Sequence, residues 1–292
     1  MTADCLKNCT FAFMELQTTV ETGKAPFSIQ PFERMLFVGS CFADGIGKRF
    51  KEDRFRVVVN PFGVMYNPVS ILHTVQKLYP EHGFSSHEMP AVAVLTLGTN
   101  HVYVLRQTGQ IVDNCMKRPQ RLFEERVLSV AECTDSLLQT VACLRRANAR
   151  MKVVLTVSPI RYRKYGYHNS QLSKATLMLA ADEVERREED VFYFPAYEIV
   201  NDELRDYRFY QPDMLHPSAQ AVDIVWEKFA GWCFTQATFD FIKAWKPIKE
   251  ALNHRPFHPE SEEYRQFMAR TKDLVRQLKA RYPELDLGDL AL

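Results

Sequence analysis

The sequence predicts an α/β fold: a five-stranded parallel sheet with helices on both faces, followed by a helical C-terminal appendage. Five short apolar runs rich in β-branched residues recur along the chain, amphipathic stretches lie between them, and the last stretch is charged and mostly helical. None of the runs alternates polar with apolar residues, which is typical of strands buried on both faces. Strands that alternate with helices imply a parallel sheet.

The predicted strands are separated by stretches long enough for helices. Apolar residues recur at helical spacing after Ser40 and after Ser70, which predicts the first two helices. Ser129 and Glu132 have the spacing of a capping box at the start of the third. The five predicted strands are residues 35–39, 55–59, 91–98, 151–157 and 191–194.

Two further helices complete the predicted sheet domain. Asn169 or Ser170 can cap the helix that carries Leu172. Pro217 is expected at the first position of the helix that carries Val225, because proline lacks the N–H that this position leaves unused.

Three parts are therefore predicted along the chain. Residues 1–26 form an N-terminal extension, residues 27–236 the sheet domain, and residues 237–292 a helical appendage that packs on the domain or contacts a partner. The regular pattern begins only after Met14, which is a candidate natural start. The apolar stretch before it is too short for the core of a signal peptide.

The composition is that of a globular protein without a strong charge. The 292 residues are 46% hydrophobic and 25% charged, with a net charge of +1. Neither nucleic acid nor a membrane is expected as a partner, because there is no basic block and no apolar run of spanning length. The seven cysteines are scattered without a CxxC pair, which indicates reduced thiols, a cytoplasmic location and no metal site. No cofactor is expected.

The segments that follow the strands carry the candidate site, because ligands of open parallel sheets bind beyond the carboxyl ends of the strands. One more polar segment stands just before the last helix of the sheet domain. The fold should bring all of them to one edge. They are Gly39-Ser40-Cys41, Asn60-Pro61-Phe62-Gly63, Gly98-Thr99-Asn100-His101, Ser158-Pro159-Ile160-Arg161 and Asp213-Met214-Leu215-His216.

These segments contain the groups needed for acyl transfer. A serine hydroxyl such as that of Ser40 attacks only when a base takes its proton, and His216 suits that role near neutral pH. Asp213, three residues earlier, can fix the histidine tautomer. The oxyanion needs donors already in place, for which the Ser40 N–H at a helix start, a glycine N–H and the Asn100 amide are candidates.

Gly39 and Cys41 flank the candidate nucleophile. Gly39 lets the strand turn sharply into the helix, so that Ser40 stands at the helix start. Cys41 is a rival nucleophile, since a thiol is intrinsically more reactive than a hydroxyl. It lies one residue into the helix, where a side chain more often faces the core.

Six short motifs are shared with one known family. Over roughly residues 27–235 the chain resembles the GSCFA-domain proteins, a branch of the SGNH (GDSL-like) hydrolase superfamily. The motifs are "GSCFA" (39–43), "NPFGVMYNP" (60–68), "TLGT" (96–99), "TVSPIR" (156–161), "SKATL" (173–177) and "YRFYQPDMLHPS" (207–218).

The resemblance implies a flavodoxin-like three-layer fold and a defined set of site residues. Ser40 is the implied nucleophile, with Asp213 and His216 as the acid–base pair. Ser40, Gly63 and Asn100 are the implied oxyanion donors. The segment "GTNH" is similar to the superfamily's G-x-N-D block, with a histidine at position 101 in place of the acidic residue.

The sequence thus predicts a serine esterase or acyl-hydrolase that removes O-acyl groups, such as acetyl, from a carbohydrate or small metabolite. Arg161 and Arg208 are candidate substrate contacts, although the charges around Arg205 and Arg208 also suit an ion-pair network that holds the Asp213 loop. An acyltransferase using the same site is one alternative, and a non-catalytic binding module is another. The C-terminal helices are a candidate surface for a homo-oligomer.

Overall fold

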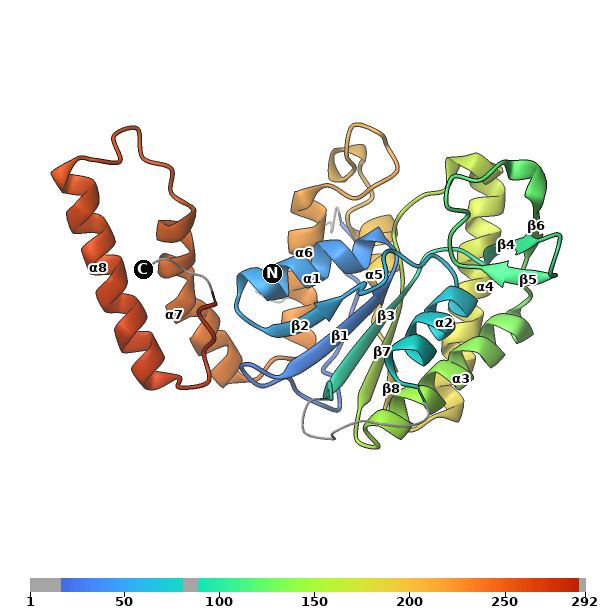
Figure 1. Ribbon diagram of the computed structural model, residues 1–292, viewed down its shortest axis with the longest axis horizontal. Helices are drawn as coiled ribbons and strands as arrows, with labels where there is room; N and C mark the ends of the chain where they lie inside the picture. The colour runs from blue at the N-terminus through green and yellow to red at the C-terminus, as the bar shows by residue number, and fades with distance from the viewer. Residues whose placement is uncertain (1–16, 81–88, 289–292) are drawn as a thin grey trace, which may run out of the picture.

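The computed structural model describes residues 17–80 and 89–288. The candidate start Met14 and the two cysteines before it lie outside the described residues, as do residues 81–88 and 289–292. At the centre is a five-stranded sheet of order β2-β1-β3-β7-β8, in which every neighbouring pair is parallel (Figure 1). Its strands are β1 (Arg34–Gly39), β2 (Arg56–Val59), β3 (Val92–Leu97), β7 (Lys152–Val157) and β8 (Val191–Tyr193).

The predicted α/β class and five-stranded parallel sheet are confirmed. The three inner strands β1, β3 and β7 are almost wholly buried, which explains their continuous apolar sequences. The edge strand β2 is only half-buried. Among the residues that the structure describes, no helix is long and apolar enough to cross a membrane.

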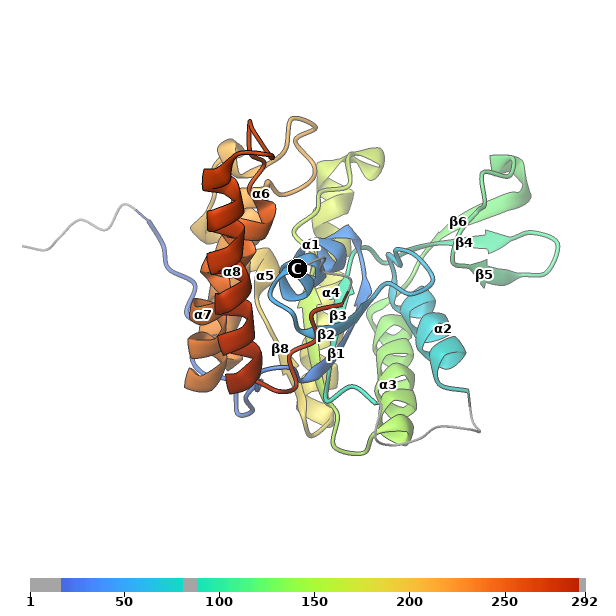
Figure 2. The same ribbon diagram turned by 60° about the vertical axis from the view of Figure 1, so that its left-hand side comes forward.

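Helices cover both faces of the sheet and give it two separate cores (Figures 1 and 2). One core lies under α2, α3 and α4, and the other lies under α1 and α6. These helices are α1 (Cys41–Glu52), α2 (Pro68–Leu78), α3 (Val130–Ala147), α4 (Gly166–Arg187) and α6 (Ala219–Cys233). Short helical turns occupy the connections: η2 (Gln120–Leu122), η3 (Arg163–Tyr165), α5 (Ala196–Glu198), η4 (Ile199–Glu203) and η5 (Tyr207–Phe209).

The helix starts match the sequence in part. The capping box of Ser129 and Glu132 is present at the start of α3. The helix α4 starts at Gly166, so both predicted caps lie inside it. Ser170 accepts a hydrogen bond from the Tyr162 N–H. The predicted position of Pro217, the first residue of its helix, is wrong, because α6 begins at Ala219. Pro217 pairs with Tyr210 in a short bridge, so the N-cap of α6 is the next residue, Ser218.

A small antiparallel sheet between β3 and α3 is a feature that the sequence analysis did not predict. It has the order β5-β4-β6 and stands away from the main sheet at one side of the molecule (Figure 2). Its sequences mix polar and apolar residues, since much of its surface is exposed. The strands are β4 (His101–Leu105), β5 (Gln110–Val112) and β6 (Phe123–Val127).

The C-terminal appendage is a hairpin of two helices, α7 (Gln236–Asn253) and α8 (Glu262–Arg281). It has its own small core, to which Phe32 from the segment before β1 contributes. The Trp245 indole N–H donates to the Glu52 carbonyl at the end of α1 (2.8 Å), and the Lys249 ammonium pairs with Asp53 (2.6 Å). The appendage therefore packs on the far end of the helix that begins after Ser40.

Candidate active site

Ser40 stands where β1 passes into α1. It is the N-cap of the helix, and its hydroxyl oxygen accepts a hydrogen bond from the Phe42 N–H (3.3 Å). Gly39 has φ of 145°, and a Cβ there would lie 2.1 Å from the Thr96 carbonyl oxygen. Only glycine therefore fits this turn. The backbone thus fixes the Ser40 side chain at the carboxyl edge of the sheet, as predicted.

Ser40 has no exposed surface in this structure. Its hydroxyl lies 3.4 Å from that of Thr96, and its Cβ faces the position where a side chain of Gly98 would stand. A substrate can therefore reach Ser40 only after the groups that cover it move.

Asp213 and His216 form a compact hydrogen-bonded pair. One Asp213 oxygen accepts the N–H groups of Leu215 (2.8 Å) and His216 (3.0 Å), and the other lies 2.6 Å from His216 Nδ1. The N–H of His216, the N–H of Leu215 and the imidazole together lower the pKa of Asp213 to about 2. The carboxylate therefore stays ionised at neutral pH and leaves His216 Nε2 as the nitrogen that can accept a proton.

The segment after β7 links this pair to the surroundings of Ser40. The Arg161 N–H donates to the Leu215 carbonyl (3.0 Å), and Arg161 Nη1 donates to the Met214 carbonyl (3.3 Å). The next residue, Tyr162, directs its hydroxyl at Gly98, where an added Cβ would lie 2.6 Å from it. The same Cβ position is 3.4 Å from Ser40 Cβ. Arg161 thus contacts the turn that carries His216, and the adjacent Tyr162 contacts Gly98, which faces Ser40.

The three predicted oxyanion donors all have protein acceptors. The Ser40 N–H donates to the Thr96 carbonyl (3.1 Å), and the Gly63 N–H closes a turn onto Asn60 (2.9 Å). The buried Asn100 amide nitrogen donates to the Leu128 carbonyl (2.7 Å). Their oxyanion role stays a prediction. The Ser40 and Gly63 N–H groups would have to share or exchange acceptors to fulfil it, whereas the Asn100 amide has a second hydrogen.

Cys41, the rival nucleophile, is half-buried. Its sulfur lies 3.9 Å from the Tyr66 hydroxyl, and the side chain packs against the core under α1. Burial, together with Cys41, raises the pKa of Tyr66 to about 12. The Cys41 thiol is thus half-buried beside the Tyr66 hydroxyl, whereas the adjacent Ser40 hydroxyl is fully buried beside that of Thr96.

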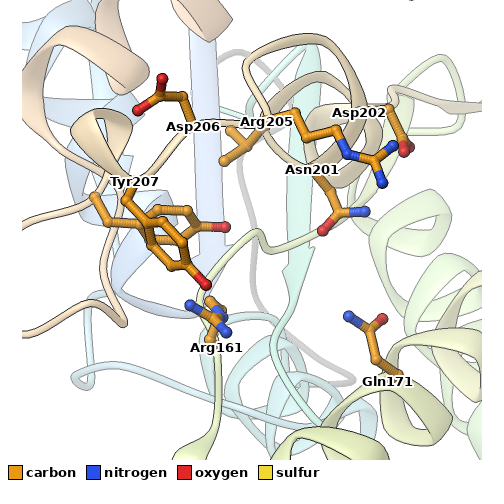
Figure 3. Close-up of a pocket in the computed structure, with 9 residues that line it drawn as sticks. Arg161, Gln171, Asn201, Asp202, Arg205, Asp206 and Tyr207 are labelled. Atoms are coloured by element: carbon orange, nitrogen blue, oxygen red, sulfur yellow. The ribbon is translucent and has the colours of Figure 1, made fainter.

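A polar cavity of about 370 Å³ is lined by Arg161, the residue whose guanidinium donates to the Met214 carbonyl of the Asp213–His216 turn. Figure 3 shows the Arg161 guanidinium next to the Tyr207 ring, with the amides of Asn201 and Gln171 facing the same space. The guanidinium also lies over the Tyr167 ring (4.3 Å). Of the two predicted substrate contacts, Arg161 lines this cavity. Arg208 does not line it and instead pairs with Asp206 (2.9 Å).

Two residues of the site carry features that the sequence analysis did not assign. Lys174 is fully buried and donates to the carbonyls of Gly98 (2.6 Å) and Ser158 (2.7 Å), so it joins the ends of β3 and β7. Tyr162 has a buried hydroxyl with no hydrogen-bond partner among the described residues. The sequence signal that could have identified them is their place in the motifs: Lys174 lies in "SKATL", and Tyr162 directly follows "TVSPIR".

Metal ligands are not assembled in the part of the chain that the structure describes: no three His, Cys, Asp or Glu side chains gather closely enough to hold an ion. The groups present at the site are a hydroxyl, a thiol, an imidazole–carboxylate pair and tyrosine hydroxyls. Groups of these kinds can perform proton transfer and nucleophilic attack.

Comparison with known proteins identifies family matches along most of the chain. A model described as the GSCFA family matches residues 34–94 and 87–229, and one described as the GSCFA domain protein, C-terminal domain, matches residues 245–290. A comparison with curated proteins finds no match.

Solved structures of several esterases share low overall similarity with the chain. A family 3 carbohydrate esterase from Clostridium thermocellum is 11% identical, with 73% of this chain and 98% of that chain covered and a TM-score of 0.40. A family 3 carbohydrate esterase from Talaromyces cellulolyticus is 11% identical (72% and 98% covered, TM-score 0.41). An acetyl xylan esterase from Butyrivibrio proteoclasticus is 9% identical (70% and 64% covered, TM-score 0.42). Similarity at this level does not identify a reaction.

Proposed function

Because the chain belongs to the GSCFA family, we propose that it is a serine esterase of the SGNH type. The observation that carries the proposal is the Asp213–His216 pair, hydrogen-bonded at 2.6 Å. A single segment, Arg161–Tyr162, contacts both the turn of this pair and the glycine against which Ser40 packs. Such a constellation is recognised by geometry and roles, not by sequence order.

In the proposed reaction, the Ser40 oxygen attacks the ester carbonyl carbon while His216 Nε2 takes the hydroxyl proton. The tetrahedral intermediate collapses, the bond to the alcohol breaks, and His216 returns the proton to the leaving alcohol. A water molecule then attacks the acyl-serine with the same base, releasing the acid and restoring Ser40. Asp213 stays ionised throughout and stabilises the imidazolium.

The cavity lined by Arg161 suits the alcohol part of a carbohydrate ester. Amide side chains and tyrosine rings are the groups that bind sugar hydroxyls and faces, and Asn201, Gln171 and Tyr207 supply them. Arg161 uses one Nη1 hydrogen on the Met214 carbonyl and retains other donors for substrate. We therefore propose O-acyl groups, such as acetyl, on a sugar or a small metabolite as the substrate. Transfer to a second hydroxyl instead of water is a variant of the same chemistry.

A non-catalytic binding module is the second candidate function. The complete burial of Ser40 and the engaged oxyanion donors favour it, because an active site needs access and free donors. In that case the cavity lined by Arg161 would bind a ligand without turnover.

The decisive experiment labels the protein with a fluorophosphonate and maps the modified residue by mass spectrometry. We expect the label on Ser40, and hydrolysis of 4-nitrophenyl acetate that the Ser40→Ala variant loses by several orders of magnitude. Cys41→Ala is the matched neighbour and should keep most of the rate. Circular dichroism should show that both variants are folded.

The opposite pattern, with activity lost in Cys41→Ala and kept in Ser40→Ala, would identify a thiol hydrolase. Absence of both labelling and hydrolysis in the wild-type protein would contradict an esterase and leave the binding module.

A further inference from the structure

The Tyr162 hydroxyl is buried without a hydrogen-bond partner among the described residues. Leaving a buried donor unsatisfied costs about 1–3 kcal/mol, so such groups in folded proteins need an explanation. The residue is otherwise well held, because its N–H donates to the Ser170 hydroxyl (3.3 Å) and its ring packs against the core under α1. Its unpaired hydroxyl is thus a feature of an ordered residue.

The hydroxyl lies beside the candidate nucleophile. At Gly98 an added Cβ would lie 2.6 Å from the Tyr162 oxygen, 2.8 Å from the Tyr66 carbonyl oxygen and 3.4 Å from Ser40 Cβ. The Tyr162 hydroxyl and Ser40 Cβ therefore both border the position that a side chain of residue 98 would occupy, and they lie at most about 6 Å apart. Glycine at position 98 keeps that position free of a side chain.

The surroundings keep the hydroxyl protonated. Burial raises the pKa of Tyr162 well above its ordinary value, and the neighbouring Tyr66, Cys41 and Tyr165 act in the same direction. The Lys174 ammonium lies 5.1 Å from the centre of the Tyr162 ring. Tyr162 is therefore a hydrogen-bond donor across the working pH range.

The donors predicted from the sequence are engaged elsewhere. The Ser40 N–H and the Gly63 N–H each give their single hydrogen to a backbone carbonyl, and the Asn100 amide gives one of its two hydrogens to the Leu128 carbonyl. A tetrahedral intermediate on Ser40 needs a donor that is already in place and has no other acceptor to give up. Tyr162 meets both conditions.

We propose that Tyr162 is a catalytic residue whose hydroxyl donates a hydrogen bond to the oxyanion formed when Ser40 attacks the ester. The inference rests on the proposed esterase function. The hydroxyl proton stays on the phenol oxygen throughout, so no bond to it forms or breaks. The negative charge develops on the former carbonyl oxygen and returns to the carbonyl when the alcohol leaves. Tyr162 accordingly binds the transition state more strongly than the substrate.

The test compares two tyrosine-to-phenylalanine variants. Tyr162→Phe removes a hydroxyl that has no partner among the described residues. Tyr193→Phe removes a hydroxyl that donates to Glu198 (2.8 Å), and it lies on β8, which β3 and β7 separate from the strand before Ser40. With 4-nitrophenyl acetate, Tyr162→Phe should lower kcat by roughly 10²–10³-fold with little change in KM, as for one lost oxyanion donor. Its melting temperature should stay equal or rise, since no hydrogen bond is lost. Tyr193→Phe should show the reverse: kcat kept and melting temperature lowered.

Both variants are assayed at a temperature at which circular dichroism shows them fully folded. A Tyr162→Phe variant with wild-type kcat would overturn the role of Tyr162 while leaving the esterase proposal intact. A wild-type protein that neither hydrolyses the ester nor reacts with a fluorophosphonate would overturn both.

Discussion

At the scale of single residues, Lys174 shows how the site constrains stability. Its ammonium is fully buried on α4 and bonds to the carbonyls of Gly98 and Ser158. Burial lowers the pKa of Lys174 to about 7, far below the ordinary value of a lysine. The residue thus joins the ends of β3 and β7, and Gly98 at the end of β3 faces Ser40. The burial that this requires disfavours the charged form of the lysine.

This lowered pKa predicts a stability that rises with pH. Between about pH 7 and 10 the unfolded chain keeps the Lys174 proton while the folded protein releases it, so unfolding takes up a proton. The free energy of unfolding should therefore increase with pH in that window, by at most about 1.4 kcal/mol per pH unit from this group. Below pH 7 both states are protonated and the contribution is constant.

Urea titrations of the wild-type protein and Lys174→Met at several pH values measure this effect. We expect a steeper rise in the wild-type protein, and the difference between the two slopes isolates Lys174 from other titrating groups. Parallel slopes would contradict a lowered pKa in the folded state, whatever the absolute stability of the variant.

The residues of the site differ in how well the sequence predicts them. Asp213 and His216 are recognisable because their three-residue spacing is local, and their hydrogen bond follows from one tight turn. Ser40 is predictable because only glycine fits the turn before it. Tyr162 is not, because its importance depends on an unpaired hydroxyl and on Gly98, which is far away in the sequence.

At the scale of elements, the strands of the main sheet are predictable because both of their faces are buried and the sequence is continuously apolar. The small sheet is harder to predict. Its strand β6 reads "FEERV" and is exposed at all but Phe123, so the sequence carries little apolar signal. The available clue was the alternation in "HVYVL" of β4, followed by the turn at Thr108–Gly109.

Asn100 anchors this small sheet to the main domain. It lies between β3 and β4, its N–H donates to Ser173 on α4 (3.0 Å), and its amide donates to the Leu128 carbonyl after β6 (2.7 Å). We expect Asn100→Ala to destabilise the protein by about 1–2 kcal/mol, because a buried carbonyl loses its donor. Ester turnover should persist if this bond is the main role of the side chain.

Thermal unfolding and steady-state kinetics on the same preparation separate the two roles of Asn100. A melting temperature like that of the wild-type protein, combined with a hundred-fold loss of kcat, would show that its second amide hydrogen serves the oxyanion after all.

At the scale of the whole molecule, the appendage and the candidate site contact opposite ends of α1. Ser40 caps the first turn of that helix, while Trp245 and Lys249 of α7 bind its last residues. The N-terminal segment contributes Phe32 to the core of the hairpin, so the appendage is joined to the sheet domain from two directions. The predicted homo-oligomer through these helices stays a prediction, and its surface would be the outer face of the hairpin (Figure 1).

Trp245→Ala tests whether the appendage is an integral part of the fold. The indole is 1% exposed, bonds to Glu52 and lies under the Arg54 guanidinium (5.1 Å), so its loss leaves a large cavity and a free carbonyl. The expected destabilisation is roughly 3–5 kcal/mol. Because the hairpin loses its largest buried side chain and its bond to α1, we expect limited proteolysis to cleave between α6 and α7 in the variant and not in the wild-type protein. Phe257→Ala is the control, since that side chain is 99% exposed and its loss should change neither the melting temperature nor the cleavage pattern. If Trp245→Ala lowers the melting temperature without exposing a cleavage site, the hairpin and the sheet domain unfold together as one unit.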